Sequence, residues 1–441
     1  MHAESAQRAA ASVCADVCAK VWKEEGPRVI GCLVRILRDV SLAEELAHDA
    51  LVAALEDWPR SGVPERPAAW LMTTAKHRAL NSLRRAKLAA RTSEALERDA
   101  HDHAQASLQS SVELDEVEAR MSDSVGDDVL RLIFAACHPV LSTEARVALT
   151  LRLIGGLTTD EIARAFLTSE PTIAQRIVRA KRSLGDAGVP FEVPSGAELA
   201  PRLASVLEVV YLIFNEGYTA TRGDDLMRPA LAAEALRIGG LLTRLAPDEP
   251  EAHGLVALMQ LHASRAATRV DADGEPVLLV DQDRTRWDAA LIAGGLAALA
   301  RAEALTTAPA APASGPGPYQ LQAAIAACHT RAPSVDATDW AQIAALYGEL
   351  ARRTPSPVIE LNRAMAISRA DGPRAGLALL DKLRSDRTLA SYHLLPAARA
   401  DLLERLGRRG EARREFERAA ELATNARQRA RLLARAAALS D

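Results

Sequence analysis

Two groups of basic side chains are the residues of this sequence best suited to chemistry. One lies between Trp70 and Arg91 and the other between Thr172 and Arg182, and neither stretch contains an acidic residue. The groups are Lys76, Arg78, Arg84, Arg85, Lys87 and Arg91, and Arg176, Arg179, Lys181 and Arg182. Lysine and arginine neutralise phosphates, and arginine pairs with guanine edges. Two such groups on one chain predict two contacts with a polyanion.

Other chemistry has little support in the residue pattern. The five cysteines show no C-x-x-C spacing, and two of them precede histidines, in Cys137–His138 and Cys328–His329. We interpret the cysteines as small buried thiols that stay reduced, and a metal site is the less favoured alternative. No phosphate-binding loop, nucleophile elbow or zinc-protease motif occurs. We therefore expect no metal, no cofactor and no enzymatic activity.

The composition indicates a helical protein. The 441 residues contain only 3% aromatic residues, and alanine, leucine and arginine dominate. The net charge of −4 arises outside the basic groups, because residues 92–128 carry eleven acidic side chains and two arginines. The N-terminus lacks the pattern of a secretory signal, and we find no run of about 18 apolar residues. We expect a cytoplasmic protein that does not contact the membrane.

The second basic group lies in a sequence typical of a helix-turn-helix, GLTTDEIARAFLTSEPTIAQRIVRAKRSL. Thr158 followed by Glu161 predicts a capping box that opens a short helix. Ser169 is expected to cap a second helix, with Pro171 in its first turn and Gly185 at its end. The apolar face of that helix comprises Ile173, Ile177 and Leu184. The alternative is a solvated basic helix in an ordinary bundle.

The segments before this motif complete a specific order. An amphipathic helix over 41–58 precedes a loop rich in proline (WPRSGVPERPAAW) and a basic helix (AWLMTTAKHRALNSLRRAK). With the acidic stretch and the helix-turn-helix, residues 10–188 resemble the sigma-70 family members called extracytoplasmic-function sigma factors. The resemblance rests on AEELAHDAL, AWLMTTAKHRALNSLRR and LTTDEIARAFLTSEPTIAQRIVRAKRSL. The sequence departs from the family pattern at Ala174 and Gln175, where lysine and serine are common. The resemblance therefore does not predict which bases these two positions prefer.

The resemblance implies binding to core RNA polymerase, through the clamp region of its largest subunit and the flap, and to promoter DNA. For the upstream (−35) element it implies Thr172, Gln175, Arg176, Arg179, Lys181 and Arg182. For the −10 element it implies Arg60, Ser61, Glu65, Arg66, Lys76, Arg78, Asn81, Arg84 and Arg85. For polymerase it implies Glu44, Glu45, His48 and Asp49, with a solvated helix face as the alternative. Asn81 can instead bond locally, and Trp58 and Trp70 are expected to pack at the ends of the loop.

Beyond Pro190 the sequence changes to apolar helices. Asn215–Tyr218 either ends a helix, with Gly217 at positive φ and Tyr218 packing back, or forms a contact surface with the preceding domains; the first is favoured. Residues 405–424 follow the second half of a tetratricopeptide repeat, and 369–383 repeat the turn and helix. The region looks like the C-terminal extension of a sigma-factor subgroup in which YLIFNEGY recurs. Stacked hairpins would offer a concave surface for a protein or small-molecule partner.

These observations predict an all-α protein: two small helical sigma domains, the second with a helix-turn-helix, then a helical repeat domain like tetratricopeptide repeats. The expected boundaries are 10–90, an acidic linker over 91–126, 127–188 and 195–441, with repeats clearest in 355–441. We expect a sigma factor regulated by its extension. The alternatives are a ligand- or partner-sensing helix-turn-helix regulator that does not bind core polymerase, and an interaction scaffold.

Overall fold

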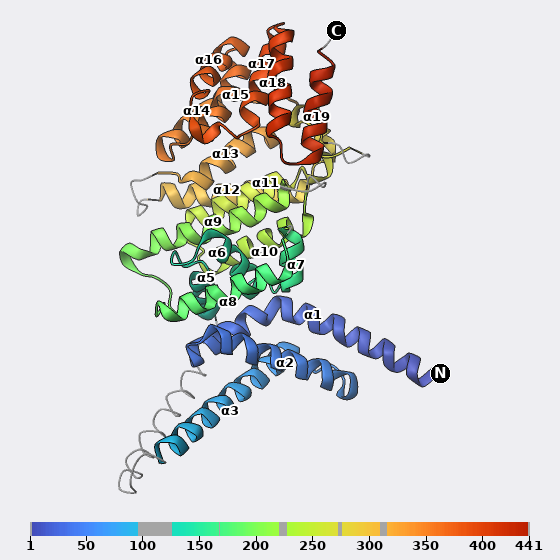
Figure 1. Ribbon diagram of the computed structural model, residues 1–441, viewed down its shortest axis with the longest axis vertical. Coiled ribbons are helices and arrows are strands. Elements are labelled where there is room, and N and C mark those ends of the chain that lie inside the picture. Colours follow the sequence, from blue (N-terminus) through green and yellow to red (C-terminus); the bar gives the residue numbers. More distant parts are fainter. Residues whose placement is uncertain are drawn as a thin grey trace. The chain divides into compact units, whose positions relative to one another are not determined.

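The computed structural model is helical in the residues it describes, which are 2–95, 126–166, 168–219, 227–271, 276–308 and 315–439 (Figure 1). Within these ranges the extended pairing is an isolated bridge between Val270 and Pro276, so the predicted all-α class is confirmed. Most of the predicted acidic linker, residues 96–125, lies outside the described residues. The chain divides into two compact units, residues 1–209 and 210–441.

The first unit contains the elements that carry the basic groups. Its helices are α1 (His2–Leu37), α2 (Val40–Ser61), α3 (Pro67–Ala95), α5 (Gly126–Ala136), α6 (Thr143–Leu153), α7 (Thr159–Ala165), α8 (Glu170–Asp186) and the first half of α9 (Leu199–Tyr218). Arg38, at φ 54°, breaks the chain between α1 and α2. Asp39 then caps α2 by accepting from the backbone N–H of Ser41 at 2.7 Å.

Small residues let α2 pack closely in this unit. Four alanines at helical spacing are fully buried: Ala43, Ala47, Ala50 and Ala54. A stripe of this kind forms an apolar face without bulky side chains, so neighbouring helices can approach closely. Helix α2 accordingly packs on α1 and α3.

Helix α9 completes the domain that contains the helix-turn-helix. Ser205 donates to the carbonyl of Cys137 at 2.6 Å, and Arg202 donates to the carbonyl of Phe134 at 2.9 Å. Val206 and Val209 on the same helix are buried. The first unit therefore extends past the predicted boundary at Gly188 and includes the start of α9.

The second unit is built from consecutive helices that pack on one another. They are the rest of α9, α10 (Pro229–Leu245), α11 (Pro250–Ala263), α12 (Ala289–Thr307), α13 (Pro318–Arg331), α14 (Trp340–Arg353), α15 (Pro357–Ala370), α16 (Pro373–Leu383), α17 (Leu394–Arg405), α18 (Arg409–Leu422) and α19 (Ala426–Ala437). Several begin with proline, as at Pro229 and Pro357, where the missing N–H costs no helical bond.

The segment Asn215–Tyr218 ends a helix, as favoured, because α9 finishes at Tyr218. The expected positive φ of Gly217 is wrong, since Gly217 is helical. A Cβ on Gly217 would lie 2.3 Å from the backbone nitrogen of Ala232, so glycine is required by the close approach of α10. Tyr218 does pack back, with its ring stacked on Phe214 at 5.5 Å between centroids.

Two helical hairpins near the C-terminus each turn at a glycine of positive φ. Gly372, between α15 and α16, has φ 97°, and Gly407, between α17 and α18, has φ 75°. Both glycines adopt a conformation that other residues resist, which accounts for glycine at each turn. The helices that follow bury their small and aromatic positions in one core, including Leu380 and Phe416.

Helix α12 packs closely on α11. By length and composition alone it is the one described helix apolar enough to cross a membrane, with a mean hydropathy of 1.4. Arg301 and Glu303 interrupt it, so the expectation of no uninterrupted apolar run of about 18 residues holds here. A Cβ on Gly295 would lie 2.8 Å from Leu261 Cγ on α11, so the two helices touch at this point.

Candidate nucleic-acid interface

The helix-turn-helix forms as its sequence predicts. Thr158 and Glu161 make the capping box at the start of α7, with both reciprocal bonds present. Ser169 caps α8 by accepting from the N–H of Thr172, and Pro171 lies in the first turn. The predicted apolar face of α8 is buried: Ile173, Ile177 and Leu184. The helix does not stop at Gly185 but continues to Asp186, and Gly188, at φ 58°, redirects the chain.

One face of α8 meets the start of α6 around an open hollow of ≈ 400 Å³. Four of the predicted upstream-element residues line it: Thr172, Gln175, Arg176 and Arg179. Ser142 and Glu144 line the opposite side. Hydrogen bonding by its own backbone N–H and by Ser142 lowers the pKa of Glu144, with a smaller contribution from Arg176. The hollow therefore presents cations and polar groups to solvent, with an ionised carboxylate at its edge.

The two remaining residues of that prediction lie elsewhere on α8. The side chain of Arg182 is 81% exposed and 3.6 Å from the carboxylate of Asp186. Lys181 follows Gln175 by six residues, so its side chain points away from that face of the helix. Its side chain is only 14% exposed, and its ammonium pairs with Glu44 of α2. In this conformation Lys181 is separated from the other predicted DNA contacts.

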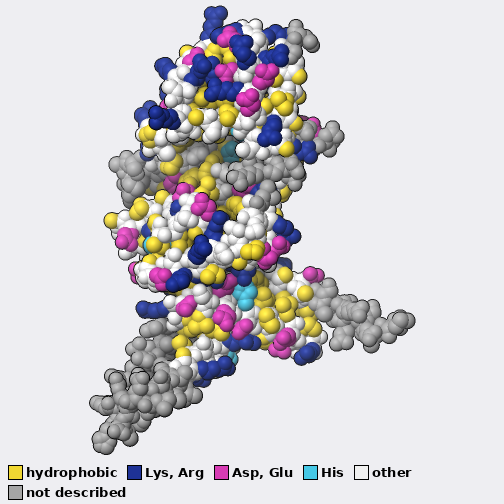
Figure 2. Space-filling model, in the orientation of Figure 1, with side chains coloured by type: hydrophobic (Ala, Val, Ile, Leu, Met, Phe, Trp, Pro, Cys, Tyr) yellow, Lys and Arg dark blue, Asp and Glu magenta, His cyan; other side chains and the backbone are white. Residues whose placement is uncertain are grey.

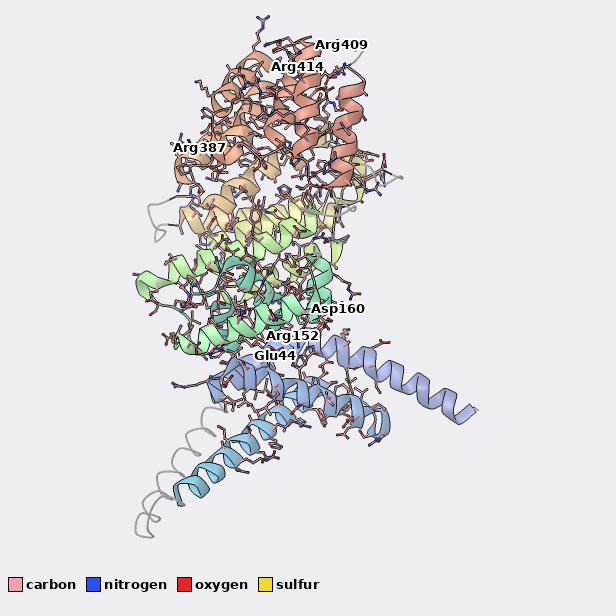
Figure 3. All side chains as sticks on the ribbon, viewed as in Figure 1. Glu44, Arg152, Asp160, Arg387, Arg409 and Arg414 are labelled. Carbon is pink, nitrogen blue, oxygen red and sulfur yellow. The ribbon has the colours of Figure 1, made fainter. Side chains whose placement is uncertain are left out.

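Glu44 lies at the centre of a buried charge cluster. It is 5% exposed and accepts from Arg152 Nε of α6 at 2.6 Å as well as from Lys181 (Figure 3). Burial raises the pKa of Glu44 most, but the two cations together outweigh it, so the pKa lies below its ordinary value. Arg152 also lies 3.1 Å from His48 Nε2. This cluster joins α2, which precedes the first basic group, to α6 and α8 of the helix-turn-helix domain.

The other two residues of the predicted polymerase face stay at or near the surface. Glu45 is exposed. Asp49 keeps half of its side chain exposed, 3.6 Å from the guanidinium of Arg78 on α3. The sequence-based grouping of Glu44, Glu45, His48 and Asp49 therefore splits in this conformation into an accessible pair and a pair in contact with α6.

The predicted loop before the basic helix is shorter than expected. Arg60 and Ser61 belong to α2, and the non-helical residues are Gly62–Arg66, with Glu65 and Arg66 exposed. Trp58 is 1% exposed and its ring meets Trp70 edge to face at 5.6 Å, so the expected packing of the two tryptophans is confirmed.

Helix α3 presents most of its predicted contacts to solvent. Asn81, Arg84 and Arg85 are exposed, while Lys76 and Arg78 are half-buried. These residues and the exposed loop lie on one continuous segment of α2–α3. The segment therefore has the charge and exposure needed for phosphate contacts.

Sequence reasoning missed Arg152 and Arg146. Arg152 is a lone cation in an otherwise mostly buried stretch of α6, and a charge in such a stretch is a usable signal that a partner is needed. Arg146 pairs with Glu208 of α9 at 3.1 Å, a partner that lies 62 residues away and that no local pattern indicates.

Comparisons with known proteins match three successive parts of the chain. Sigma-70 region 2 matches residues 21–88 and sigma-70 region 4 matches residues 131–184. A family of unknown function, DUF6596, matches residues 202–303. An uncharacterized protein of Rhizobium meliloti (strain 1021) is 43% identical over 406 residues, which cover 91% of this chain and 90% of that protein. No solved structure matches.

Fold and candidate interface together define a helical protein with two exposed basic elements. Region 2 covers α2 and most of α3, and region 4 covers the helix-turn-helix. Regions 2 and 4 together support an RNA polymerase sigma factor of the sigma-70 family. Core RNA polymerase and promoter DNA are accordingly its partners. The roles of single residues in those contacts stay predictions.

Proposed function

We propose that this chain is a sigma factor of the extracytoplasmic-function type that selects promoters and is regulated by its C-terminal helical extension. The observation that supports this proposal most directly is the open face of α8, where Gln175, Arg176 and Arg179 line one hollow. Glutamine pairs with adenine edges and arginine with guanine edges in the major groove. The place of action is the cytoplasm, where polymerase and promoter meet.

Helix α3 and the Gly62–Arg66 loop are proposed to read and open the −10 element. The loop is short and exposed, and it is held at both ends by the packed pair Trp58 and Trp70. Extruding a base from the duplex costs a few kcal/mol. A loop held rigidly at its ends loses less conformational entropy when it captures that base, so more of the contact energy offsets the cost. Exchanging residues 62–66 for the loop of another family member should change the preferred −10 base and leave polymerase binding intact.

Polymerase binding through Glu44 requires the contact of α2 with α6 and α8 to open. In the described conformation Arg152 and Lys181 both donate hydrogen bonds to the Glu44 carboxylate. We therefore propose that the described conformation is a resting state, and that polymerase competes with region 4 for this face of α2.

The extension is proposed to be a tetratricopeptide-like regulatory domain. Its support is the repeated hairpin turn at Gly372 and Gly407 and the buried Ala412 and Phe416 of α18. Two domains on one chain meet at an effective concentration near millimolar, so even weak control contacts are populated.

The test is selection of DNA by the chain bound to core polymerase, from duplexes randomised over both promoter elements. We expect two enriched elements at fixed spacing, and none from core polymerase alone. Enrichment of one element by the chain without polymerase, unchanged when polymerase is added, would support a simple helix-turn-helix regulator instead.

A further inference from the structure

The second unit contains a cavity of ≈ 570 Å³ whose lining includes none of the predicted DNA or polymerase contacts. It is walled by the segment 276–282 and by helices α15, α17 and α19, together with the ends of neighbouring elements. The segment is tied to α19, because Arg431 donates to the carbonyl of Pro276 at 3.2 Å. A volume of this size lies within the range of sites for small organic ligands.

Two arginines at one end of the cavity surround Tyr218. Arg265 donates to the Tyr218 hydroxyl at 3.0 Å, and Arg269 lies over the Tyr218 ring at 3.7 Å from its centroid. Arg269 also donates to the carbonyl of Tyr218. Burial is the main cause that lowers the pKa of Arg269, with Arg265 adding to the effect. Among the described residues, these guanidinium groups have no carboxylate at ion-pair distance.

Two further arginines of the lining make no ion pair within the described ranges. Arg369 is exposed and lies over the ring of Trp340 at 5.8 Å, and Arg431 makes its contact with the Pro276 carbonyl. Burial and the neighbouring Arg435 lower the pKa of Arg431, against smaller opposing effects of Asp281 and Asp401. Asp401, also in the lining, is 3.3 Å from Arg435. The cavity therefore has an excess of positive charge, partly desolvated at Arg269 and Arg431, and an anion inside it would gain charge-assisted hydrogen bonds.

The rest of the lining is apolar. It includes Leu278, Leu361, Met365, Leu394 and Leu432. Leu278 and Leu394 are 38% and 42% exposed, so the lining presents apolar surface to solvent. In the space-filling view, basic and apolar side chains intermingle over α14–α19 (Figure 2). Positive charge beside exposed apolar surface suits an amphipathic anion better than an inorganic one.

We propose that this cavity binds one small organic anion, a carboxylate or sulfonate carried on an apolar body. The arginines would hold the acidic group, and the leucines with Trp340 would cover the body. The cavity is lined by several separate segments that converge on one volume, which favours a compact ligand over an extended peptide. This binding does not depend on the proposed sigma-factor function.

The experiment uses anilinonaphthalene sulfonate as the probe, titrated into the full-length chain and followed by its fluorescence. The neutral parent compound phenylnaphthylamine serves as the matched probe without the charge. We expect one saturable sulfonate site per chain. Arg431→Gln should weaken the sulfonate roughly tenfold and the neutral probe little, since one charge-assisted bond is lost. Arg369→Gln removes no direct hydrogen bond to the protein within the described residues. This variant should weaken the affinity for the sulfonate probe about threefold.

Arg414→Gln is the control, because Arg414 lies on the exposed face of α18 outside the cavity (Figure 3). Its affinity for both probes should equal that of the parent chain, and near-ultraviolet circular dichroism should be the same for all variants. Unchanged sulfonate affinity in Arg431→Gln and Arg369→Gln would overturn the proposal. So would equal losses for the charged and neutral probes. Displacement of the sulfonate by micromolar synthetic peptide of residues 92–127 would overturn it in favour of the chain's own acidic segment.

Discussion

Replacing Arg152 by methionine should loosen the contact of α2 with α6. The guanidinium donates to Glu44 at 2.6 Å and to the carbonyl of Leu157 at 3.1 Å, and it lies 3.1 Å from His48. Removing one partner of a fully buried ion pair costs about 3–5 kcal/mol. Glu44 keeps Lys181, and the Arg152 side chain is 21% exposed, so we expect about 1–3 kcal/mol after discounting for solvent screening.

The assay is hydrogen–deuterium exchange of the full-length chain, followed over α2 and α6. A loss of 1–3 kcal/mol raises the open population roughly 5- to 150-fold, and amides protected by this contact should exchange faster by the same factor. If polymerase needs the open form, its apparent affinity should rise by up to that factor, saturating when most molecules are open.

The control variant is Arg164→Met on α7. Arg164 pairs with Asp160 at 3.0 Å, but both side chains are more than half exposed, so this pair is worth at most about 1 kcal/mol. Exchange in α2 should be unchanged in this control. Equal exchange in the Arg152→Met variant and the parent chain would refute the idea that the cluster holds the two domains together.

Three further outcomes are expected. Arg179→Ala should weaken binding of the upstream element by about 1–3 kcal/mol at fixed salt, measured by anisotropy of labelled promoter DNA; equal binding would remove Arg179 from the reading face. Burial lowers the pKa of His329 from 6.5 to about 4, so the unfolded state binds more protons between these values and stability falls as pH drops from 6.5 to 4. His329→Gln should flatten the pH dependence of the unfolding free energy, obtained from urea titrations, by on the order of 2–3 kcal/mol across that window; an unaltered slope would contradict the assignment. Truncation after Gly188 removes Ser205 from the Cys137 carbonyl and should abolish the cooperative unfolding of region 4, whereas a chain ending at Thr219 should retain it.

The local features of the fold were readable from the sequence. Capping pairs such as Thr158 and Glu161 act over three residues, and the apolar face of α8 follows from helical period alone. The exposure of Gln175 and Arg179, on the face predicted to read DNA, follows from the same period. These predictions succeeded because each depends on neighbours in the chain.

Features that depend on distant partners were not readable. Gly217 was expected at positive φ at the end of a helix. The reason for glycine there is instead the close approach of Ala232, which belongs to the next helix. Lys181 was grouped with its neighbours on α8, but its partner Glu44 lies 137 residues earlier. The cavity in the second unit combines residues from Tyr218 to Arg435, so no local pattern could indicate it.

Run-off transcription tests the central claim most directly. Core polymerase and the full-length chain are combined on a template that carries the two selected elements, beside a template with the upstream element scrambled. We expect one transcript of defined length from the first template, dependent on the chain, and its near loss with Arg176→Ala and Arg179→Ala combined. Equal transcription with and without the chain, from a template that the chain binds tightly, would contradict its assignment as the promoter-selecting subunit.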